Sequence, residues 1–393
     1  MRIILILIAI ISFWGVENQT KGNSMVCQGV KAPKDSLESR WKGYINLDHY
    51  LIPFWNADTI YDEISQVIKT RNGSEGTLLF NVSKILSVRS ADLKRVYVID
   101  KDFTYHDDKI VLTPASSIPF LATGDLLFNA EKPGWSMPGK VKGTFVLFTE
   151  GTFFRSKQIS VTYIPKRTLK WEGPVPIFAK TTLPNTIKKL KNKKPLKVVF
   201  FGNSIETGAN SSAFQSQSPY MPSWPELIVY QLQHVYGKKV IFSNKAVAGT
   251  MASWGKDHAN ELVVPENPDL MIIGFGMNDG SAGVLPEKYK EDIEGILERV
   301  RSKNPRAEFI LIAPMLANPN SIQSNIQSLY KAELDEIAQQ QKGVAVADLT
   351  GVTIELLNHK NYQDLTGNNI NHPNDYLSRW YAQNILGLLV KEK

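Results

Sequence analysis

The chain has little of what marks disulfide-rich or membrane-spanning proteins. It contains one cysteine, Cys27, in 393 residues, and a single cysteine cannot form an internal disulfide. Beyond the N-terminus, no segment has the ~20 consecutive apolar residues that a membrane-spanning helix needs. Charged residues make up only 21% and hydrophobic residues 43%, which is typical of globular proteins. The length suits two ordinary domains, each with its own core.

The positive charge is concentrated in one place. The net charge is +7. Much of it comes from one basic run that comprises Lys188, Lys189, Lys191, Lys193, Lys194 and Lys197. The run has no interleaved aromatic residues and matches no nucleic-acid-binding motif. We therefore expect a solvated helix or linker here, and no nucleic-acid partner.

The N-terminus resembles a secretory signal peptide. Arg2 precedes an apolar run from Ile3 to Val16, which is too short for a stable membrane span. We assign residues 1–24 to the signal, although no Ala-x-Ala site fixes the cleavage point, and expect a secreted or periplasmic protein. Val26, directly before Cys27, matches a lipoprotein signal poorly, so lipid anchoring is the less favoured alternative.

Residues 28–180 are predicted to form a β-sandwich or jelly-roll domain. Short runs of alternating or β-branched residues recur there, separated by turn residues such as Asp107-Asp108. The runs cover residues 76–82, 95–99, 109–113, 143–149 and 158–163. No helical periodicity competes with this pattern, and several short strands at such spacing are typical of a sandwich or jelly roll. A proline-rich joint, Gly173–Pro176, follows and suits a domain boundary.

Residues 185–393 change to a strand–loop–helix rhythm. The candidate strands are residues 197–201, 240–243, 270–275, 308–313 and 344–347. The candidate helices are residues 224–236, 286–303, 321–341 and 376–390. Strands that alternate with helices predict a parallel sheet covered by helices on both faces.

Four short motifs follow strands or precede the last helix, and together they have the chemistry of acyl transfer. Ser204 offers a hydroxyl nucleophile, and His372 offers a base that titrates near neutral pH. Gly249 can supply a backbone N–H and Asn278 a carboxamide to an oxyanion, with the N–H of Ser204 as a third donor. Each motif alone is equally compatible with an ordinary turn, helix cap or surface histidine. The four together, in this order, predict an active site.

This pattern resembles the SGNH hydrolases, also called the GDSL-like esterase/lipase superfamily. The four family blocks match Ser204, Gly249, Asn278 and His372, with Asn203 where the family usually has aspartate. The resemblance covers about residues 197–390. It implies a flavodoxin-like three-layer α/β/α fold and ester hydrolysis through an acyl-enzyme. It implies no metal or organic cofactor.

One position departs from the family pattern. The family usually has an acid three residues before the histidine, and this position is Asn369 here. An asparagine can orient an imidazole but cannot stabilise imidazolium as a carboxylate does. Three alternatives stay open. Ser204 and His372 work as a dyad oriented by Asn369 or a backbone carbonyl; Asp375 or Asp364 supplies the acid; or the site is impaired. We favour the first two.

The preceding β-rich region is similar in architecture to the jelly-roll partners of two-domain carbohydrate esterases. That likeness favours a secreted esterase that removes O-acetyl groups from a glycan. Trp41, Trp55 and Trp135 are candidates for stacking on sugars, although large aromatics are more often part of a core. A lipid esterase, thioesterase or acyltransferase is the enzymatic alternative. A glycan-binding protein with a decayed site is the non-catalytic one.

Overall fold

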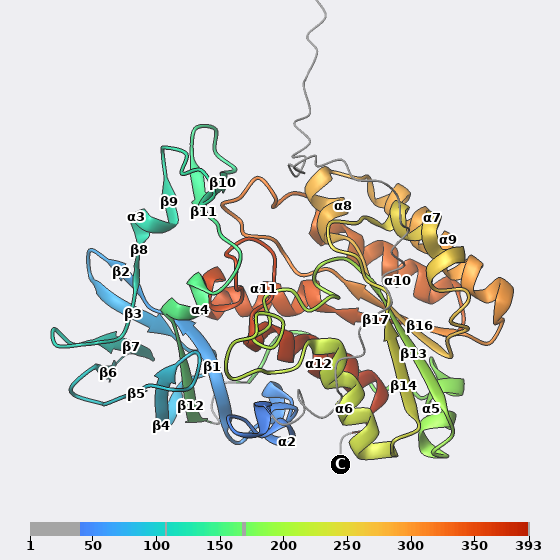
Figure 1. Ribbon diagram of the computed structural model, residues 1–393, viewed down its shortest axis with the longest axis horizontal. Coiled ribbons are helices and arrows are strands. Elements are labelled where there is room, and N and C mark those ends of the chain that lie inside the picture. Colours follow the sequence, from blue (N-terminus) through green and yellow to red (C-terminus); the bar gives the residue numbers. More distant parts are fainter. Residues whose placement is uncertain (1–39, 107, 167–169, 392–393) are drawn as a thin grey trace, which may run out of the picture.

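The computed structural model describes residues 40–106, 108–166 and 170–391. The predicted signal peptide and Cys27 lie outside the described residues. Figure 1 shows two parts that lie side by side: a β-rich half (residues 40–166) and an α/β half (residues 184–391). The C-terminal helix α12 (Asp375–Leu389) lies between them.

The α/β half is built on one five-stranded parallel sheet. Its strands are β13 (Leu196–Gly202), β14 (Val240–Asn244), β15 (Leu270–Gly274), β16 (Glu308–Ala313) and β17 (Val344–Asp348). They are ordered β14-β13-β15-β16-β17, and every pair is parallel. This is the flavodoxin-like order, in which ligands bind beside the carboxyl ends of the first and third strands. The five strands predicted for this half and its parallel α/β fold class are confirmed.

Alternating apolar side chains of β13 explain the two helical layers. Val199 and Phe201 pack in one core and Val198 and Phe200 in another, as expected for a strand that is buried on both faces. The first core is covered by α7 (Ala252–Leu262), α9 (Pro286–Lys303) and α10 (Tyr330–Gln340). The second is covered by α5 (Pro184–Lys191), α6 (Trp224–Tyr236), α11 (Leu349–His359) and α12.

Three of the four predicted helices are confirmed within about a residue, and one is wrong at its start. The chain from Ser321 runs as a loop to a short 3-10 turn at Gln327–Leu329, and α10 begins only at Tyr330. Three lysines of the basic run lie in α5. The partly exposed Lys189 pairs with Asp269 at 2.6 Å. This part of the basic run therefore lies on a solvated helix, as expected.

The β-rich half contains three small sheets. The first is ordered β1-β12-β4-β5 and comprises β1 (Ile60–Gln66), β12 (Gln158–Pro165), β4 (Val82–Ser90) and β5 (Val96–Tyr97). The second is ordered β6-β7-β3-β2-β8 and comprises β6 (Phe103–His106), β7 (Lys109–Leu112), β3 (Gly73–Thr77), β2 (Ile68–Thr70) and β8 (Leu121–Ala122). The third joins β10 (Ser136–Pro138), β11 (Phe145–Leu147) and β9 (Leu127–Phe128). The strand-rich half is confirmed, but the strand predicted at residues 76–82 is wrong, because this segment joins the end of β3 to the start of β4. The jelly roll stays a prediction.

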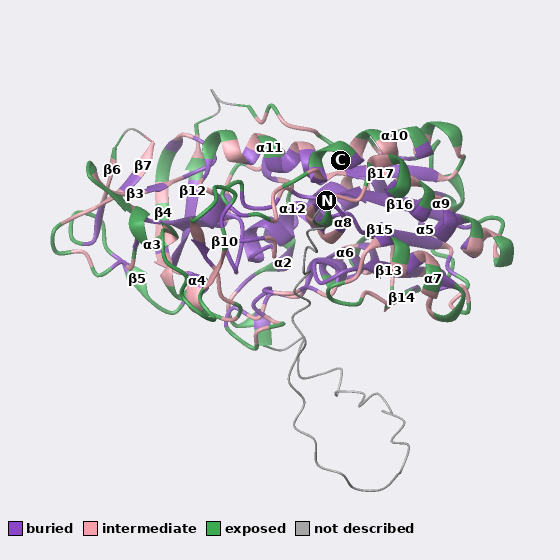
Figure 2. Cartoon of the chain, turned by 90° about the horizontal axis from the view of Figure 1, so that it is seen from above, coloured by how far each residue is buried: buried purple, intermediate pink, exposed green. Residues whose placement is uncertain are grey.

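The two halves share one hydrophobic core. Val161 and Tyr163 of the β-rich half belong to the same buried cluster as Trp224 and Trp380 of the α/β half. Figure 2 shows buried residues in β12, α12 and β17 alike, across the junction. On α12, Gln383 donates to the backbone carbonyls of Tyr50 and Ile52. The halves are therefore packed together as one body of side chains.

Buried charges also cross this junction. Lys360 is fully buried, and its Nζ lies 2.5 Å from Glu63 Oε1 on β1 and 3.7 Å from Asp364 Oδ2. Asp364 in turn accepts hydrogen bonds from the Gln66 N–H and the Thr77 hydroxyl. Burial raises the pKa of Asp364 to about 6 although Lys360 opposes this. Every one of these groups has a partner from the other half.

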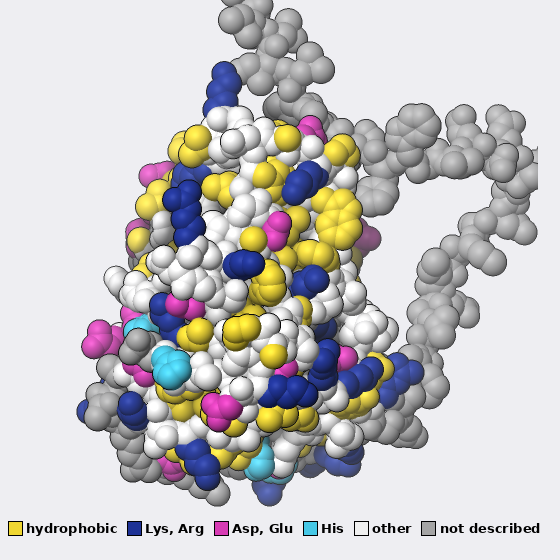
Figure 3. Space-filling view, turned by 90° about the vertical axis from the view of Figure 1, so that its left-hand side faces the viewer, with side chains coloured by type: hydrophobic (Ala, Val, Ile, Leu, Met, Phe, Trp, Pro, Cys, Tyr) yellow, Lys and Arg dark blue, Asp and Glu magenta, His cyan; other side chains and the backbone are white. Residues whose placement is uncertain are grey.

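The outer face of the β-rich half is mixed in character. Figure 3 shows lysine and arginine side chains dispersed over this face between apolar and acidic ones. No helix in the described ranges has the length and apolar character needed to span a membrane.

Because Lys360 is a buried ion-pair partner of both Glu63 and Asp364, Lys360→Met should destabilise the protein by about 3–5 kcal/mol. Urea unfolding, followed by circular dichroism, measures the change. Lys331→Met is the matched control, since Lys331 pairs with Asp335 at a partly exposed helix surface and should cost less than about 1 kcal/mol. Equal losses in the two variants would contradict a structural role for the buried cluster.

Candidate active site

Strand β13 delivers Ser204 to the carboxyl edge of the sheet. Asn203 holds the turn, because its Nδ2 donates to the Gly274 carbonyl and its Oδ1 accepts from the Ile205 N–H. Below the turn, the side chain of the buried Glu206 fills the space beside Gly202 and Gly274. A Cβ atom at Gly202 would lie 2.4 Å from Glu206 Oε2, and one at Gly274 would lie 2.1 Å from Glu206 Oε1, so both positions need glycine. Burial raises the pKa of Glu206 to about 8, so this carboxyl group is neutral at pH 7.

The neighbouring strand ends bring hydrogen-bond donors to Ser204. Gly249 lies after β14 with a φ of +80°, which favours glycine, and a Cβ at this position would meet nothing within 4 Å. Asn278 follows β15, and one of its amide hydrogens is donated to the Thr250 carbonyl at 2.9 Å, which leaves the other available. Across the described chain, no group accepts a hydrogen bond from the N–H of Ser204 or Gly249. These donors can serve an oxyanion.

His372 lies directly beside the serine. Its Nε2 is 2.9 Å from Ser204 Oγ, which is the distance at which a base can take the hydroxyl proton. The loop that carries the histidine is organised by Asn368, whose Oδ1 accepts from the N–H groups of Ile370, Asn371 and His372. Asn368 is fully buried, so these three hydrogen bonds are shielded from water.

The acid that faces His372 comes from the β-rich half. Glu150 lies in the turn after β11, and its Oε1 is 3.2 Å from His372 Nδ1. The Asn368 amide donates to the same oxygen at 3.0 Å, and the Asn210 amide donates to Oε2 at 2.8 Å. The hairpin of β10 and β11 is itself joined to the α/β half, where the Lys140 N–H donates to the Asn320 carbonyl.

This arrangement selects one tautomer of the imidazole. Burial alone would raise the pKa of Glu150, but the hydrogen bond and charge of His372, with the amides of Asn368 and Asn210, lower it to about 2. A carboxylate at Nδ1 favours the tautomer with its proton on Nδ1, which leaves Nε2 free to accept the serine proton. Because the pKa is lowered, the pair stabilises the fold at neutral pH, and this contribution is lost as the pH falls toward 2.

Asn369 does not orient His372, so this expectation is wrong. Its Nδ2 donates to the Leu147 carbonyl, and its Oδ1 accepts from Gln363 and Asn318. With a φ of +65°, the residue turns its buried side chain away from the ring. The neighbouring Asn368, not Asn369, reaches the acid.

Asp375 and Asp364 are likewise not the missing acid. Asp375 pairs with Arg155 at 2.9 Å and accepts from the Ser212 N–H. Asp364 lies in the buried cluster of Lys360 at the junction. Sequence reasoning missed Glu150 because it is 222 positions from His372 and Thr149-Glu150-Gly151 has the composition of an ordinary turn. The available signal was an acid directly after a predicted strand.

Residues 200–379 match the model of the GDSL-like Lipase/Acylhydrolase family. The match covers somewhat less than half of the chain and lies within the α/β half. The matched segment contains Ser204, Gly249, Asn278 and His372, whereas Glu150 lies outside it. The acid that completes the site therefore comes from a part of the chain that the family model does not cover.

Several known proteins are similar to parts of the chain. An arylesterase of Vibrio mimicus is 26% identical over 105 residues, which are 27% of this chain and 48% of that protein. The chain thus matches about half the length of this curated relative. Among solved structures, a two-domain esterase active on acetylated mannans is 20% identical with a TM-score of 0.44, over 54% of each chain. Axe2, an acetylxylan esterase from Geobacillus stearothermophilus, is 19% identical with a TM-score of 0.42, over 50% of this chain and 95% of its own.

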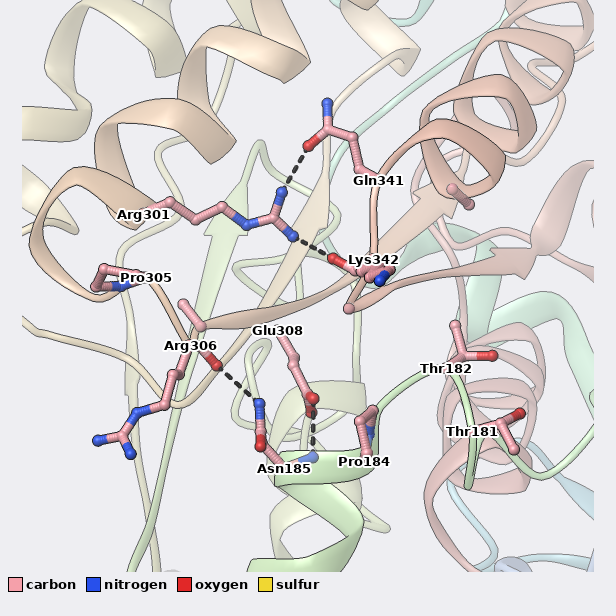
Figure 4. Close-up of a pocket in the computed structure, with 13 residues that line it drawn as sticks. Thr181, Thr182, Pro184, Asn185, Arg301, Pro305, Arg306, Glu308, Gln341 and Lys342 are labelled. Carbon is pink, nitrogen blue, oxygen red and sulfur yellow. Dashed lines mark hydrogen bonds between the residues drawn. The ribbon is translucent and has the colours of Figure 1, made fainter.

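A separate open pocket of about 670 Å³ lies at the opposite edge of the sheet, by the amino ends of β16 and β17. Figure 4 shows that its main polar groups are already paired. Arg301 donates to Gln341 and to the Lys342 carbonyl, and Glu308 accepts from the N–H of Asn185. None of the residues that line this pocket belongs to the site around Ser204.

Replacement of the acid tests its assignment. Glu150→Gln keeps the shape but removes the charge, and we expect kcat/KM on p-nitrophenyl acetate to fall by about 10²-fold or more. The Glu150 side chain is 51% exposed, so water partly replaces the lost charge and limits the fall in kcat/KM. Addition of Asn369→Asp should not restore activity, because this side chain does not reach the ring. Glu131→Gln, at an exposed position of the same half, is the control, and an equal effect of both glutamines would contradict the assignment.

Proposed function

We propose that the protein is a carboxylic ester hydrolase that removes short acyl groups, acetyl in the first place, from carbohydrate. The observation that carries the proposal is the 2.9 Å approach of His372 Nε2 to Ser204 Oγ, with Glu150 at Nδ1, in a chain whose α/β half matches an acylhydrolase family. The apolar N-terminal run supports export of the enzyme to the compartment where glycans are found.

The chemistry follows from the positions of these groups. Ser204 Oγ attacks the ester carbonyl carbon while its proton passes to His372 Nε2. The resulting oxyanion accepts hydrogen bonds from the N–H groups of Ser204 and Gly249 and from the Asn278 amide. The carbon–oxygen bond to the sugar then breaks, and the leaving hydroxyl takes the proton from His372. Water repeats the sequence on the acyl-enzyme and releases the carboxylic acid.

One exposed tryptophan supports a sugar as the alcohol part of the ester. Trp41 is 7% exposed and belongs to the core, and Trp55 packs against Trp380, so neither presents a free face. Trp135 is 46% exposed and lies edge-on to Phe153, with 5.2 Å between ring centroids. Its carbonyl accepts from the N–H of Phe148, two residues before Glu150. Trp135 directly precedes β10, which pairs with β11, the strand that leads to Glu150, and an exposed aromatic face at this place suits a pyranose ring.

Acetate release tests the proposed reaction. The wild type should release acetate from p-nitrophenyl acetate and from acetylated xylan or mannan, and Ser204→Ala should lower kcat by at least about 10³-fold because the nucleophile is lost. Equal inactivity of both forms on all three substrates would sink the proposal. A series of p-nitrophenyl esters of increasing chain length separates a lipid esterase from a deacetylase, since only the former should prefer long chains.

Truncation of Trp135 tests the sugar-binding role. Trp135→Ala should raise KM for acetylated manno- or xylo-oligosaccharides by about 10-fold and leave kinetics on p-nitrophenyl acetate within about 2-fold. Phe120→Ala removes another exposed aromatic of the same half, 42% exposed, and should change neither KM. If loss of Trp135 weakens binding of long-chain acyl esters instead, the residue contacts the acyl group and not the sugar.

A further inference from the structure

We infer that Asn210 is a positioning residue that keeps the Glu150 carboxylate at the imidazole; the inference rests on the proposed function. Asn210 lies in the loop that follows Ser204. Its Nδ2 donates to Glu150 Oε2 at 2.8 Å. The same Nδ2 lies 3.2 Å from His372 Nδ1. With the proton on Nδ1 both atoms are donors, so the hydrogen bond of Asn210 goes to Glu150 and not to the ring. About half of the Glu150 side chain is exposed to solvent, so packing alone does not hold the carboxylate. The hydrogen bond from Asn210 keeps it in place.

The orientation of this amide is itself fixed. Gln215 donates through Nε2 to Asn210 Oδ1 and to the Gly151 carbonyl, both at 2.5 Å. With Oδ1 occupied as an acceptor, Nδ2 is the group that points to Glu150. Asn210 is 3% exposed with a φ of +66°, a conformation that asparagine tolerates better than most residues. These contacts define a single placement of the amide.

A buried cation fastens the loop of Asn210 to both halves. Arg155 lies on α4 (Phe153–Lys157) of the β-rich half and is 7% exposed. It donates to the Asn210 carbonyl and to Gln215 Oε1, both at 3.3 Å. Its third contact is Asp375 at the first turn of α12, at 2.9 Å. The segment that carries Glu150 therefore also holds the asparagine that orients it.

The geometry allows a carboxylate at position 210 to take the place of the Glu150 carboxylate. Because Nδ2 of Asn210 is 3.2 Å from His372 Nδ1, an aspartate at position 210 places a carboxylate oxygen at the ring. In the presence of Glu150 this change brings two like charges together and is unfavourable. Without Glu150, the new carboxylate replaces the missing one.

Steady-state kinetics on p-nitrophenyl acetate test the inference with the full-length chain. Asn210→Ala should lower kcat on the order of 10- to 100-fold, with KM within about 2-fold, because a hydrogen bond to a charged group is lost. The double variant Glu150→Ala/Asn210→Asp should be at least about 10-fold more active than Glu150→Ala alone. Wild-type kcat in Asn210→Ala, or no recovery in the double variant, would overturn the inference.

A matched control and a spectroscopic measurement separate positioning from damage to the fold. Asn358→Ala removes an exposed asparagine that contacts only Glu355 in the described chain and should change nothing. The ¹⁵N chemical shifts of His372 report which nitrogen holds the proton, so Asn210→Ala should reduce the Nδ1-protonated tautomer. An unchanged tautomer in a folded Asn210→Ala protein would contradict the role even if Ser204 proves to have no esterase activity.

Discussion

The site depends on one contact between the two halves of the molecule, the approach of Glu150 to His372 Nδ1. Ser204, His372 and the oxyanion donors all belong to the α/β half, but no carboxylate of that half reaches the imidazole. Without a carboxylate at Nδ1, an imidazole has no partner that fixes its tautomer and stabilises its charged form. The geometry of the junction is thus a condition for the chemistry and not only for stability.

Hydrophobic burial alone does not define such a contact, because it is non-directional and varies little with small sliding movements. The ion pairs and hydrogen bonds at the junction are directional, and they fix the position of one half relative to the other. Lys360 and Glu63 pair across it, and Arg155 joins α4 to Asp375. Breaking such buried pairs is costly because it leaves an uncompensated charge. We suggest that these pairs select one placement of the halves, and this placement puts Glu150 at the ring.

The sequence predicts the α/β half well because its strands and helices are determined by patterns of neighbouring residues. Strands β13 and β15 are buried apolar runs that end shortly before Ser204 and Asn278, whereas Gly249 follows the partly exposed edge strand β14. Helices were harder to predict. The β-branched side chains of residues 352–354 weaken the helical pattern of α11. The loop before α10 contains Ile322, Ile326 and Leu329, whose spacing resembles that of a helix. The sequence marks Glu150 only as an acid directly after a predicted strand; its pairing with His372 arises from the packing of segments 222 positions apart.

Asn369 shows how the expected acid position has been used differently. Its amide donates to the Leu147 carbonyl at the end of β11, the strand that leads into the turn with Glu150. The side chain thus links the loop of His372 to the strand that precedes Glu150, although it forms a hydrogen bond with neither residue. A carboxylate at 369 would lose this donor and face the Leu147 carbonyl inside the protein, where burial of an unpaired charge is unfavourable. An acid at position 369 and an acid at position 150 therefore exclude each other. With the carboxylate supplied by Glu150, position 369 needs an amide, and this amide helps to bring Glu150 into place.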